Sequence, residues 1–261
     1  MLFIRSTIFN CLFYAWTVVT LIVHLPLLLL PRHYLFGAAG RWARQVNWLM
    51  KKITNTEIEI RGLEHLPEVP CIIASKHQSV WESFNCLNAA TPPAIVLKSE
   101  LTWLPIFGQM CVKSQMISVH RRGGIVAIRG MIADGKQAIS QHRNIVIFPQ
   151  GTRTAPTEGM DKKPYLNGVA ALYTSLNVPV IPVALNSGIY WPRRRWVHYP
   201  GKIILEYLKP IEPGLSRRDF TRLLAQSIET RTDSLVKEGL SKLPNSSAAV
   251  QSGSGLNDEG G

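Results

Sequence analysis

The N-terminal part of the chain is a long apolar stretch that predicts a membrane-associated helix. No charged residue occurs between Arg5 and Arg32, and residues 7–30 have the length of about 20 residues that crosses the core of a bilayer. His24 and Pro26 interrupt the stretch, so the helix could instead kink and dip into one leaflet. The spanning and the dipping forms both remain open from the sequence.

The residues that follow combine basic and aromatic side chains, a mixture typical of a helix at a lipid headgroup interface. An excess of positive charge is typical of the cytoplasmic side of a membrane. A cleaved secretory signal is a competing interpretation, but the apolar stretch is longer than a usual signal core, and only residues 37–39 resemble a cleavage site. We therefore expect residues 1–52 to form a membrane segment and an interfacial helix. The mixed residues are Arg32, His33, Tyr34, Phe36, Arg41, Trp42, Arg44, Trp48, Lys51 and Lys52.

Beyond this region the pattern changes to short apolar runs that alternate with helical stretches, which is the signature of an α/β domain. Ser216 and Asp219 have the spacing of a capping box ahead of the last helical stretch. The C-terminal end has few large apolar side chains and cannot offset the entropy of ordering. We expect one domain over residues 53–240 and a flexible tail over residues 241–261. The expected strands are residues 57–60, 71–75, 95–98, 116–119, 145–148, 178–184 and 202–207, and the expected helices are residues 80–90, 125–141, 168–176 and 217–240.

Composition narrows the possible function classes. Of the 261 residues, 46% are hydrophobic and only 18% are charged, which excludes an intrinsically disordered protein. The net charge of +12 favours a polyanionic partner such as nucleic acid, anionic lipid or an acidic carrier protein. The basic and aromatic residues at 191–196 would suit each of these, but the apolar N-terminus argues against a nucleic-acid partner. The four cysteines lack the spacing of a zinc site or a disulfide framework, so we expect no metal.

A strand-to-helix turn carries the first candidate for catalysis. His77 follows an expected strand, and Glu82 stands five residues later in the first turn of an expected helix. The two side chains can meet only if His77 lies in the turn before the helix, because five residues on one helix rotate by about 500°. Glu82 would then fix the imidazole tautomer and leave the other ring nitrogen free to accept a proton. The alternative is structural, because Ser79 and Glu82 also have the spacing of a capping box.

A second turn, which follows the expected strand at residues 145–148, could hold an anion. Gly151 allows the backbone to approach a ligand closely, Thr152 offers a hydroxyl, and Arg153 offers a forked donor that suits phosphate oxygens. The competing interpretation is an ordinary turn with a solvated arginine.

These two segments, in this order, resemble the glycerolipid acyltransferases, and in particular the 1-acyl-sn-glycerol-3-phosphate acyltransferases of bacterial type. The resemblance covers residues 57–210. His77 and Glu82 match the His-x4-Asp motif of that family, and residues 148–153 (Phe-Pro-Gln-Gly-Thr-Arg) match its Phe-Pro-Glu-Gly-Thr-Arg motif. Further matches to family motifs are Lys98, Glu100, Leu101, Pro105 and Gly108, then Val119, His120 and Arg121, then residues 180–183 around a proline.

Three positions depart from the family pattern. Glu82 and His120 each stand where the family has an aspartate, and Gln150 stands where it has a glutamate. Glu82 keeps the carboxylate and should still orient His77. Gln150 lacks a charge that in the family contacts the acceptor, so it leaves the acceptor's identity open.

The resemblance implies a single α/β domain with a mixed, largely parallel sheet flanked by helices, preceded by a membrane helix or helical hairpin, on the cytoplasmic face of a bacterial inner membrane. It implies acyl transfer from acyl-CoA or acyl carrier protein to the free hydroxyl of lysophosphatidic acid, giving phosphatidic acid, without a cofactor. Another lysolipid acceptor, such as a lyso-ornithine lipid or a lysophospholipid with a head group, and a catalytically silent membrane scaffold remain alternatives. The implied catalytic residues are His77 and Glu82, and the implied substrate-binding residues are Arg121, Gln150, Gly151, Thr152 and Arg153.

Overall fold

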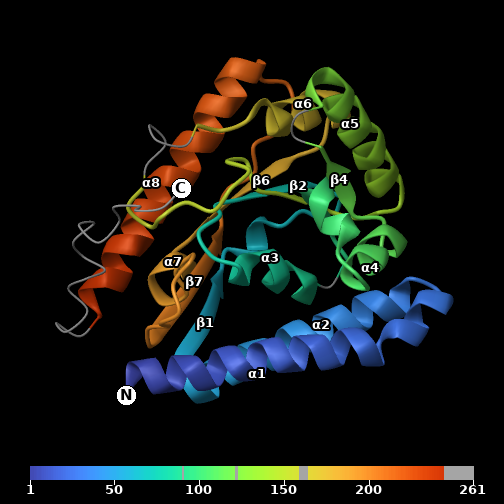
Figure 1. Ribbon diagram of the computed structural model, residues 1–261. Coiled ribbons are helices and arrows are strands. Elements are labelled where there is room, and N and C mark those ends of the chain that lie inside the picture. The colour runs from blue at the N-terminus through green and yellow to red at the C-terminus, as the bar shows by residue number, and fades with distance from the viewer. Residues whose placement is uncertain (90, 121–122, 159–163, 244–261) are drawn as a thin grey trace.

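The computed structural model describes residues 1–89, 91–120, 123–158 and 164–243, which form helical layers around a central β-sheet (Figure 1). The strands found in these residues are β1 (Thr56–Arg61), β2 (Ile72–Ser75), β3 (Ala94–Lys98), β4 (Ile117–Val119), β5 (Ile145–Ile147), β6 (Val180–Leu185) and β7 (Gly201–Tyr207). Their order across the sheet is β1-β7-β6-β2-β5-β3-β4. Neighbouring strands pair in parallel except β6 and β7, which are antiparallel. The expected mixed, largely parallel sheet is confirmed.

Helices cover both faces of the sheet, which explains why the central strands β2, β5 and β6 are apolar and buried on both sides. The α-helices of the described residues are α1 (Leu2–Val23), α2 (His33–Leu49), α3 (Trp81–Asn85), α4 (Phe107–Lys113), α5 (Gly124–Ser140), α6 (Asn167–Leu176), α7 (Ser187–Tyr190) and α8 (Arg217–Ser241). On one face, α1, α2 and α3 pack over strand residues such as Ile73 and Val146. On the other face, α5, α6 and the first half of α8 pack over residues such as Ile72 and Ile145. Successive strand residues therefore belong to different cores, as the pleat of a strand requires.

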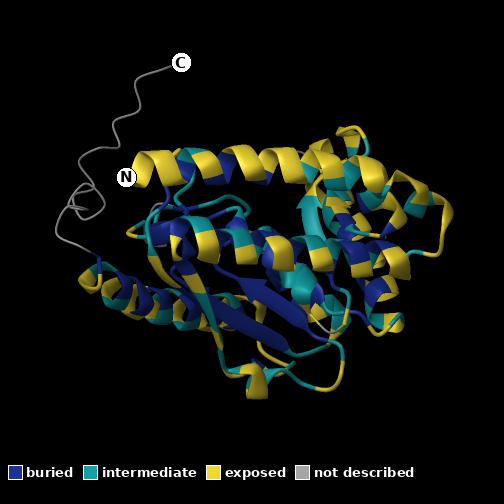
Figure 2. Cartoon of the chain, turned by 90° about the horizontal axis from the view of Figure 1, so that it is seen from below, coloured by how far each residue is buried: buried dark blue, intermediate teal, exposed yellow. Residues whose placement is uncertain are grey.

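The N-terminal helix packs against α2 and against the segment that joins β6 to β7. Phe9 and Phe13 of α1 are buried, and both rings meet the ring of Trp191 edge-on at centroid distances of 5.2 and 5.3 Å. Oδ1 of Asn10 lies 2.8 Å from Nε2 of His198. The opposite side of α1 carries exposed apolar side chains, and Figure 2 shows this helix exposed along much of its length above a buried sheet.

The sequence predicts most elements correctly. All seven expected strands are present, with ends that differ by at most two residues, and the expected helices at residues 125–141, 168–176 and 217–240 correspond to α5, α6 and α8. The cap of α8 is also confirmed, because the backbone N–H of Asp219 donates to Oγ of Ser216 at 3.1 Å.

One predicted helix differs from the structure, two short helices were not predicted, and part of the expected tail lies beyond the described residues. The helix expected at residues 80–90 is too long, because α3 ends at Asn85 and a 3₁₀ turn over Cys86–Asn88 follows. The short helices α4 and α7 have no counterpart in the predicted elements, since each spans too few residues to establish a helical period. Residues 244–261 of the expected tail lie outside the described residues.

Candidate active site

His77 lies in the turn between β2 and α3, at the carboxyl edge of the parallel strands. The backbone N–H of the preceding residue, Lys76, donates to the carbonyl of Val183 at 2.9 Å and so carries the β2–β6 pairing up to the turn. The imidazole ring stacks on Phe148, which follows β5, with the ring centroids 4.2 Å apart. The carboxyl ends of neighbouring parallel strands thus bring together the two turns that the sequence singles out.

Glu82 holds the imidazole from the first turn of α3. Its Oε1 lies 2.9 Å from Nδ1 of His77, and the same oxygen accepts hydrogen bonds from the backbone N–H groups of Gln78 and Ser79, both at 2.6 Å. Because Oε1 acts as an acceptor toward these backbone groups, its remaining neighbour Nδ1 must be the donor. The ring proton of His77 therefore lies on Nδ1, and Nε2 is left as the basic nitrogen. The carboxylate therefore caps the turn and also holds the imidazole of His77, so the capping contact and the contact expected of a catalytic pair occur together.

The two side chains differ in their contact with solvent. The side chain of Glu82 is 1% exposed, whereas that of His77 is 15% exposed. A buried carboxylate interacts more strongly with a neighbouring charge than one surrounded by water. Glu82 is therefore well placed to stabilise an imidazolium on a ring that still reaches the surface.

The second oxygen of this carboxylate has a partner that the sequence does not predict. Oγ of Ser187, at the start of α7, donates to Oε2 of Glu82 at 2.8 Å. The next residue, Gly188, donates its backbone N–H to Oε1 of Gln78 at 3.1 Å. The sequence signal nearest to these residues is the apolar motif at 180–183. That motif gives no indication of a contact with the turn that carries His77, which we call the histidine turn.

The turn after β5 contacts His77 at both of its ends, through Phe148 and through Thr154. Phe148 stacks on the imidazole, and the backbone N–H and the hydroxyl of Thr154 donate to the carbonyl of His77 at 2.8 and 3.2 Å. Between them, Gly151 adopts φ of +65° and donates its N–H to the carbonyl of Phe148 at 2.8 Å. Gln150 is buried, with 5% of its surface exposed. The structure therefore brings this turn directly against His77.

The remaining predicted substrate-binding residues have different positions. Thr152 and Arg153 are partly exposed on the same turn, where they can meet a ligand. The guanidinium of Arg193, from the basic segment at 191–196, donates to the carbonyl of Arg153 and so adds a second cation to this turn. Arg121 lies outside the described residues.

A small cavity lies beside Glu82. It has a volume of about 30 Å³ and is lined by Glu82, Cys86, Phe148 and Tyr207, among others. Burial raises the pKa of the Cys86 thiol to about 12, so this sulfur is not a thiolate at neutral pH and is a poor nucleophile. In the part of the chain that the structure describes, no group of three or more His, Cys, Asp or Glu residues could hold a metal ion.

Comparisons with known proteins extend over the same two turns. A family model described as Acyltransferase matches residues 57–186. The 1-acyl-sn-glycerol-3-phosphate acyltransferase of Pseudomonas aeruginosa is 34% identical over 204 residues, which cover 77% of each chain. The protein of the same name from Escherichia coli is 28% identical over 156 residues, 59% of this chain and 62% of that one. The crystal structure of the 1-acyl-sn-glycerophosphate acyltransferase from Thermotoga maritima superimposes with a TM-score of 0.72 at 20% identity, covering 90% of this chain and 98% of that one.

Proposed function

The chain belongs to the family of 1-acyl-sn-glycerol-3-phosphate acyltransferases, and from this we propose that its two turns transfer an acyl chain from a thioester donor to lysophosphatidic acid. The enzyme is an O-acyltransferase, and phosphatidic acid is its product. The donor is acyl-CoA or acyl carrier protein. The observation that carries the catalytic part of this proposal is the 2.9 Å contact between His77 and the buried Glu82.

The chemistry is a direct transfer between the two substrates. Nε2 of His77 removes the proton from the free hydroxyl of the acceptor, and the oxygen attacks the thioester carbonyl. The new ester bond forms, the carbon–sulfur bond breaks, and the imidazolium returns the proton to the leaving thiolate. Glu82 stabilises the imidazolium between these steps. The raised pKa of Cys86 supports a route without a cysteine acyl-enzyme.

The acceptor phosphate would bind at the turn after β5. Arg153 offers a bidentate donor for phosphate oxygens, and Thr152 offers a hydroxyl beside it. Arg121 is expected to join them from the sequence motif it matches. Gln150 is neutral and buried at the same turn, so an acceptor that bears a head group on its phosphate is the second candidate.

We propose that α1 lies along the interface of one leaflet instead of crossing the bilayer. By length and composition α1 could span a membrane. Its N-terminal half, however, is held to the domain by Phe9 and Asn10, contacts that a spanning helix would have to give up. Its outer side would then face lipid on the cytoplasmic face of a bacterial inner membrane. The exposed apolar residues of that side include Ile4, Ile8, Leu12, Val19, Ile22 and Val23.

The test is thiol release by the purified protein in detergent, with acyl-CoA or acyl carrier protein as donor and lysophosphatidic acid as acceptor. The His77→Ala variant should lose turnover by about 10²- to 10⁴-fold, the range a general base contributes. Replacing the exposed His33 of α2 with alanine serves as the matched control and should leave turnover unchanged. Arg153→Ala should mainly raise the KM for the acceptor, because it removes a phosphate contact.

Mass spectrometry of the lipid product separates the alternatives. Phosphatidic acid that forms only with an intact His77 supports the proposal. Release that starts only with a lysophospholipid bearing a head group, or with a lyso-ornithine lipid, would move the acceptor assignment to that lipid. If the wild type released no thiol with any donor and acceptor, a catalytically silent membrane scaffold would be favoured.

A further inference from the structure

We propose that Ser187 is a positioning residue for acyl transfer, a role that rests on the proposed catalysis by His77 and Glu82. Oγ of Ser187 donates to Oε2 of Glu82 at 2.8 Å, while Oε1 of the same carboxylate lies 2.9 Å from Nδ1 of His77. The hydroxyl therefore acts on the imidazole through the carboxylate and not on the substrate itself. The pair in the histidine turn becomes a chain of three side chains, Ser187, Glu82 and His77.

Burial makes each donor to this carboxylate important. Glu82 accepts from Ser187, from His77 and from the backbone N–H groups of Gln78 and Ser79. Three of these donors meet Oε1, whereas the hydroxyl of Ser187 donates to Oε2. Ser187 is fully buried, so shortening its side chain removes a donor from an oxygen that bulk solvent does not reach directly.

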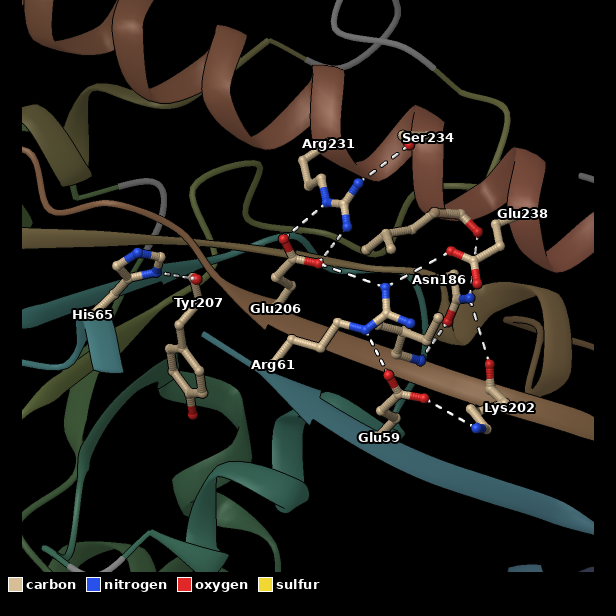
Figure 3. A network of polar contacts seen from close by, with 12 residues as sticks. Glu59, Arg61, His65, Asn186, Lys202, Glu206, Tyr207, Arg231, Ser234 and Glu238 are labelled. Atoms are coloured by element: carbon tan, nitrogen blue, oxygen red, sulfur yellow. Dashed lines mark hydrogen bonds and ion pairs between the residues drawn. The ribbon is translucent and has the colours of Figure 1, made fainter. Parts of the chain in front are cut away.

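Hydrogen bonds of the neighbouring residue hold the backbone at Ser187 in place, so the hydroxyl stays directed at Glu82. The preceding residue, Asn186, accepts a hydrogen bond from the backbone N–H of Ile204 in β7 at 2.8 Å. Its amide nitrogen donates to the carbonyls of Lys202 and of Leu235 in α8, at 3.5 and 3.4 Å (Figure 3). Asn186 thus ties the start of α7 to the sheet and to the long C-terminal helix.

A second contact fixes the start of α7 against the histidine turn. Gly188 donates its N–H to the side chain of Gln78, the residue that follows His77. A Cβ at position 188 would lie 2.9 Å from Cβ of Gln78, so the glycine permits this close approach. The turn is therefore clamped at Gln78 by Gly188 and at Glu82 by Ser187.

The length of Glu82 suits this arrangement. From the first turn of α3, the side chain must reach His77 with one oxygen and Ser187 with the other. In a Glu82→Asp variant the side chain would be shorter by one methylene, about 1.5 Å. A hydrogen bond stretched by that length would no longer be a hydrogen bond. In that variant the carboxylate could keep one of the two partners but not both. Ser187 and the longer carboxylate therefore form a matched pair.

Removal of the hydroxyl should change both the rate and its pH dependence. In Ser187→Ala, Oε2 loses its donor, so the carboxylate turns away more easily or holds the imidazolium proton more tightly. We expect kcat to fall about tenfold while KM for both substrates stays within about twofold. The acid limb of the kcat/KM profile should shift to higher pH, which a general loss of stability would not cause.

The decisive experiment is a double-mutant cycle on the full-length enzyme in detergent. The four proteins are the wild type, Ser187→Ala, Glu82→Asp and the double variant, each assayed for thiol release across pH. Ser187→Ala should cost about tenfold in the wild type but less than about twofold in the Glu82→Asp background, because a carboxylate that holds only one of its two partners no longer links the hydroxyl of Ser187 to His77. Ser114→Ala, at another buried serine, is the matched control and should change neither kcat nor the pH profile.

The outcomes keep this proposal separate from the catalytic assignment. If His77→Ala retains full turnover, the assignment of the base is wrong. If His77→Ala is inactive but Ser187→Ala costs the same factor in both backgrounds, with an unchanged pH profile, Ser187 is only structural. If Ser187→Ala does not fold, Ser187→Cys keeps a weak donor of similar size, and an intermediate kcat supports the proposal while wild-type kinetics overturn it.

Discussion

His198 joins the N-terminal helix to the domain through a contact that acid should weaken. The residue is 2% exposed, its ring lies edge-on to Phe9 and Trp191, and Nε2 is 2.8 Å from Oδ1 of Asn10. These three neighbouring groups carry no charge. Burial lowers the pKa of His198 from 6.5 to about 4, because the site does not compensate the cost of removing an imidazolium from water.

The direction of the pH effect follows from proton binding in the two states. Between pH 6.5 and pH 4 the unfolded chain carries a proton on this histidine and the folded protein does not. The free energy of unfolding therefore falls as the pH drops below 6.5, and the loss levels off below pH 4. The whole shift corresponds to about 3 kcal/mol, of which about 2 kcal/mol is lost between neutral pH and about pH 5.

Urea unfolding in mild detergent at neutral and at acidic pH measures this loss. His198→Gln keeps an amide that can face Asn10 but does not titrate, so its stability should fall by about 2 kcal/mol less than that of the wild type on going to about pH 5. The His33→Gln variant, at an exposed position on α2, controls for the removal of a histidine. Equal losses in the wild type and in His198→Gln would refute the reasoning.

Three further predictions concern other contacts of the fold. Glu229→Gln should lower the free energy of unfolding by about 3–5 kcal/mol, because the ammonium of Lys76, only 1% exposed, loses a carboxylate at 2.7 Å; an unchanged urea midpoint would contradict this. Gly151→Ala should lower the free energy of unfolding by about 1–2 kcal/mol, since the φ of +65° is unfavourable for alanine; a thermal unfolding curve equal to that of the wild type would contradict this. Trp81→Phe should lower the melting temperature, because the fully buried indole donates to Oδ1 of Asn47 at 3.0 Å; an unaltered melting temperature would show that this hydrogen bond adds nothing.

The strands could be predicted because their pattern depends on local sequence and on burial alone. β2 and β6 are buried along their whole length, so each appears as a continuous apolar run. The end of α3 depends on tertiary contacts instead. At the last residue of the helix, Oδ1 of Asn85 accepts a hydrogen bond from Asn47 in α2, 38 positions away in the chain. No periodicity in residues 80–90 contains that information.

The candidate site likewise has a part that local sequence predicts and a part that depends on tertiary structure. His77 and Glu82 are only five residues apart, so their spacing, together with the expected start of the helix after His77, predicts that they can meet. Ser187 reaches Glu82 across 105 positions of the chain, because β6 lies beside β2 in the sheet. That neighbourhood is a property of the strand order, which the sequence pattern does not specify. The predicted pair was therefore accessible from spacing, whereas its third member required the fold.

The N-terminal helix combines both kinds of information. Its hydropathy predicts contact with lipid, and two polar residues four positions apart, Ser6 and Asn10, lie on the same side of this mainly apolar helix. The structure supplies their partner, the segment at 191–198, whose His198 contacts both residues. The same segment reaches the turn after β5, because Arg193 donates to the carbonyl of Arg153. A single segment, residues 191–198, thus contacts both α1 and the turn that would bind the acceptor phosphate.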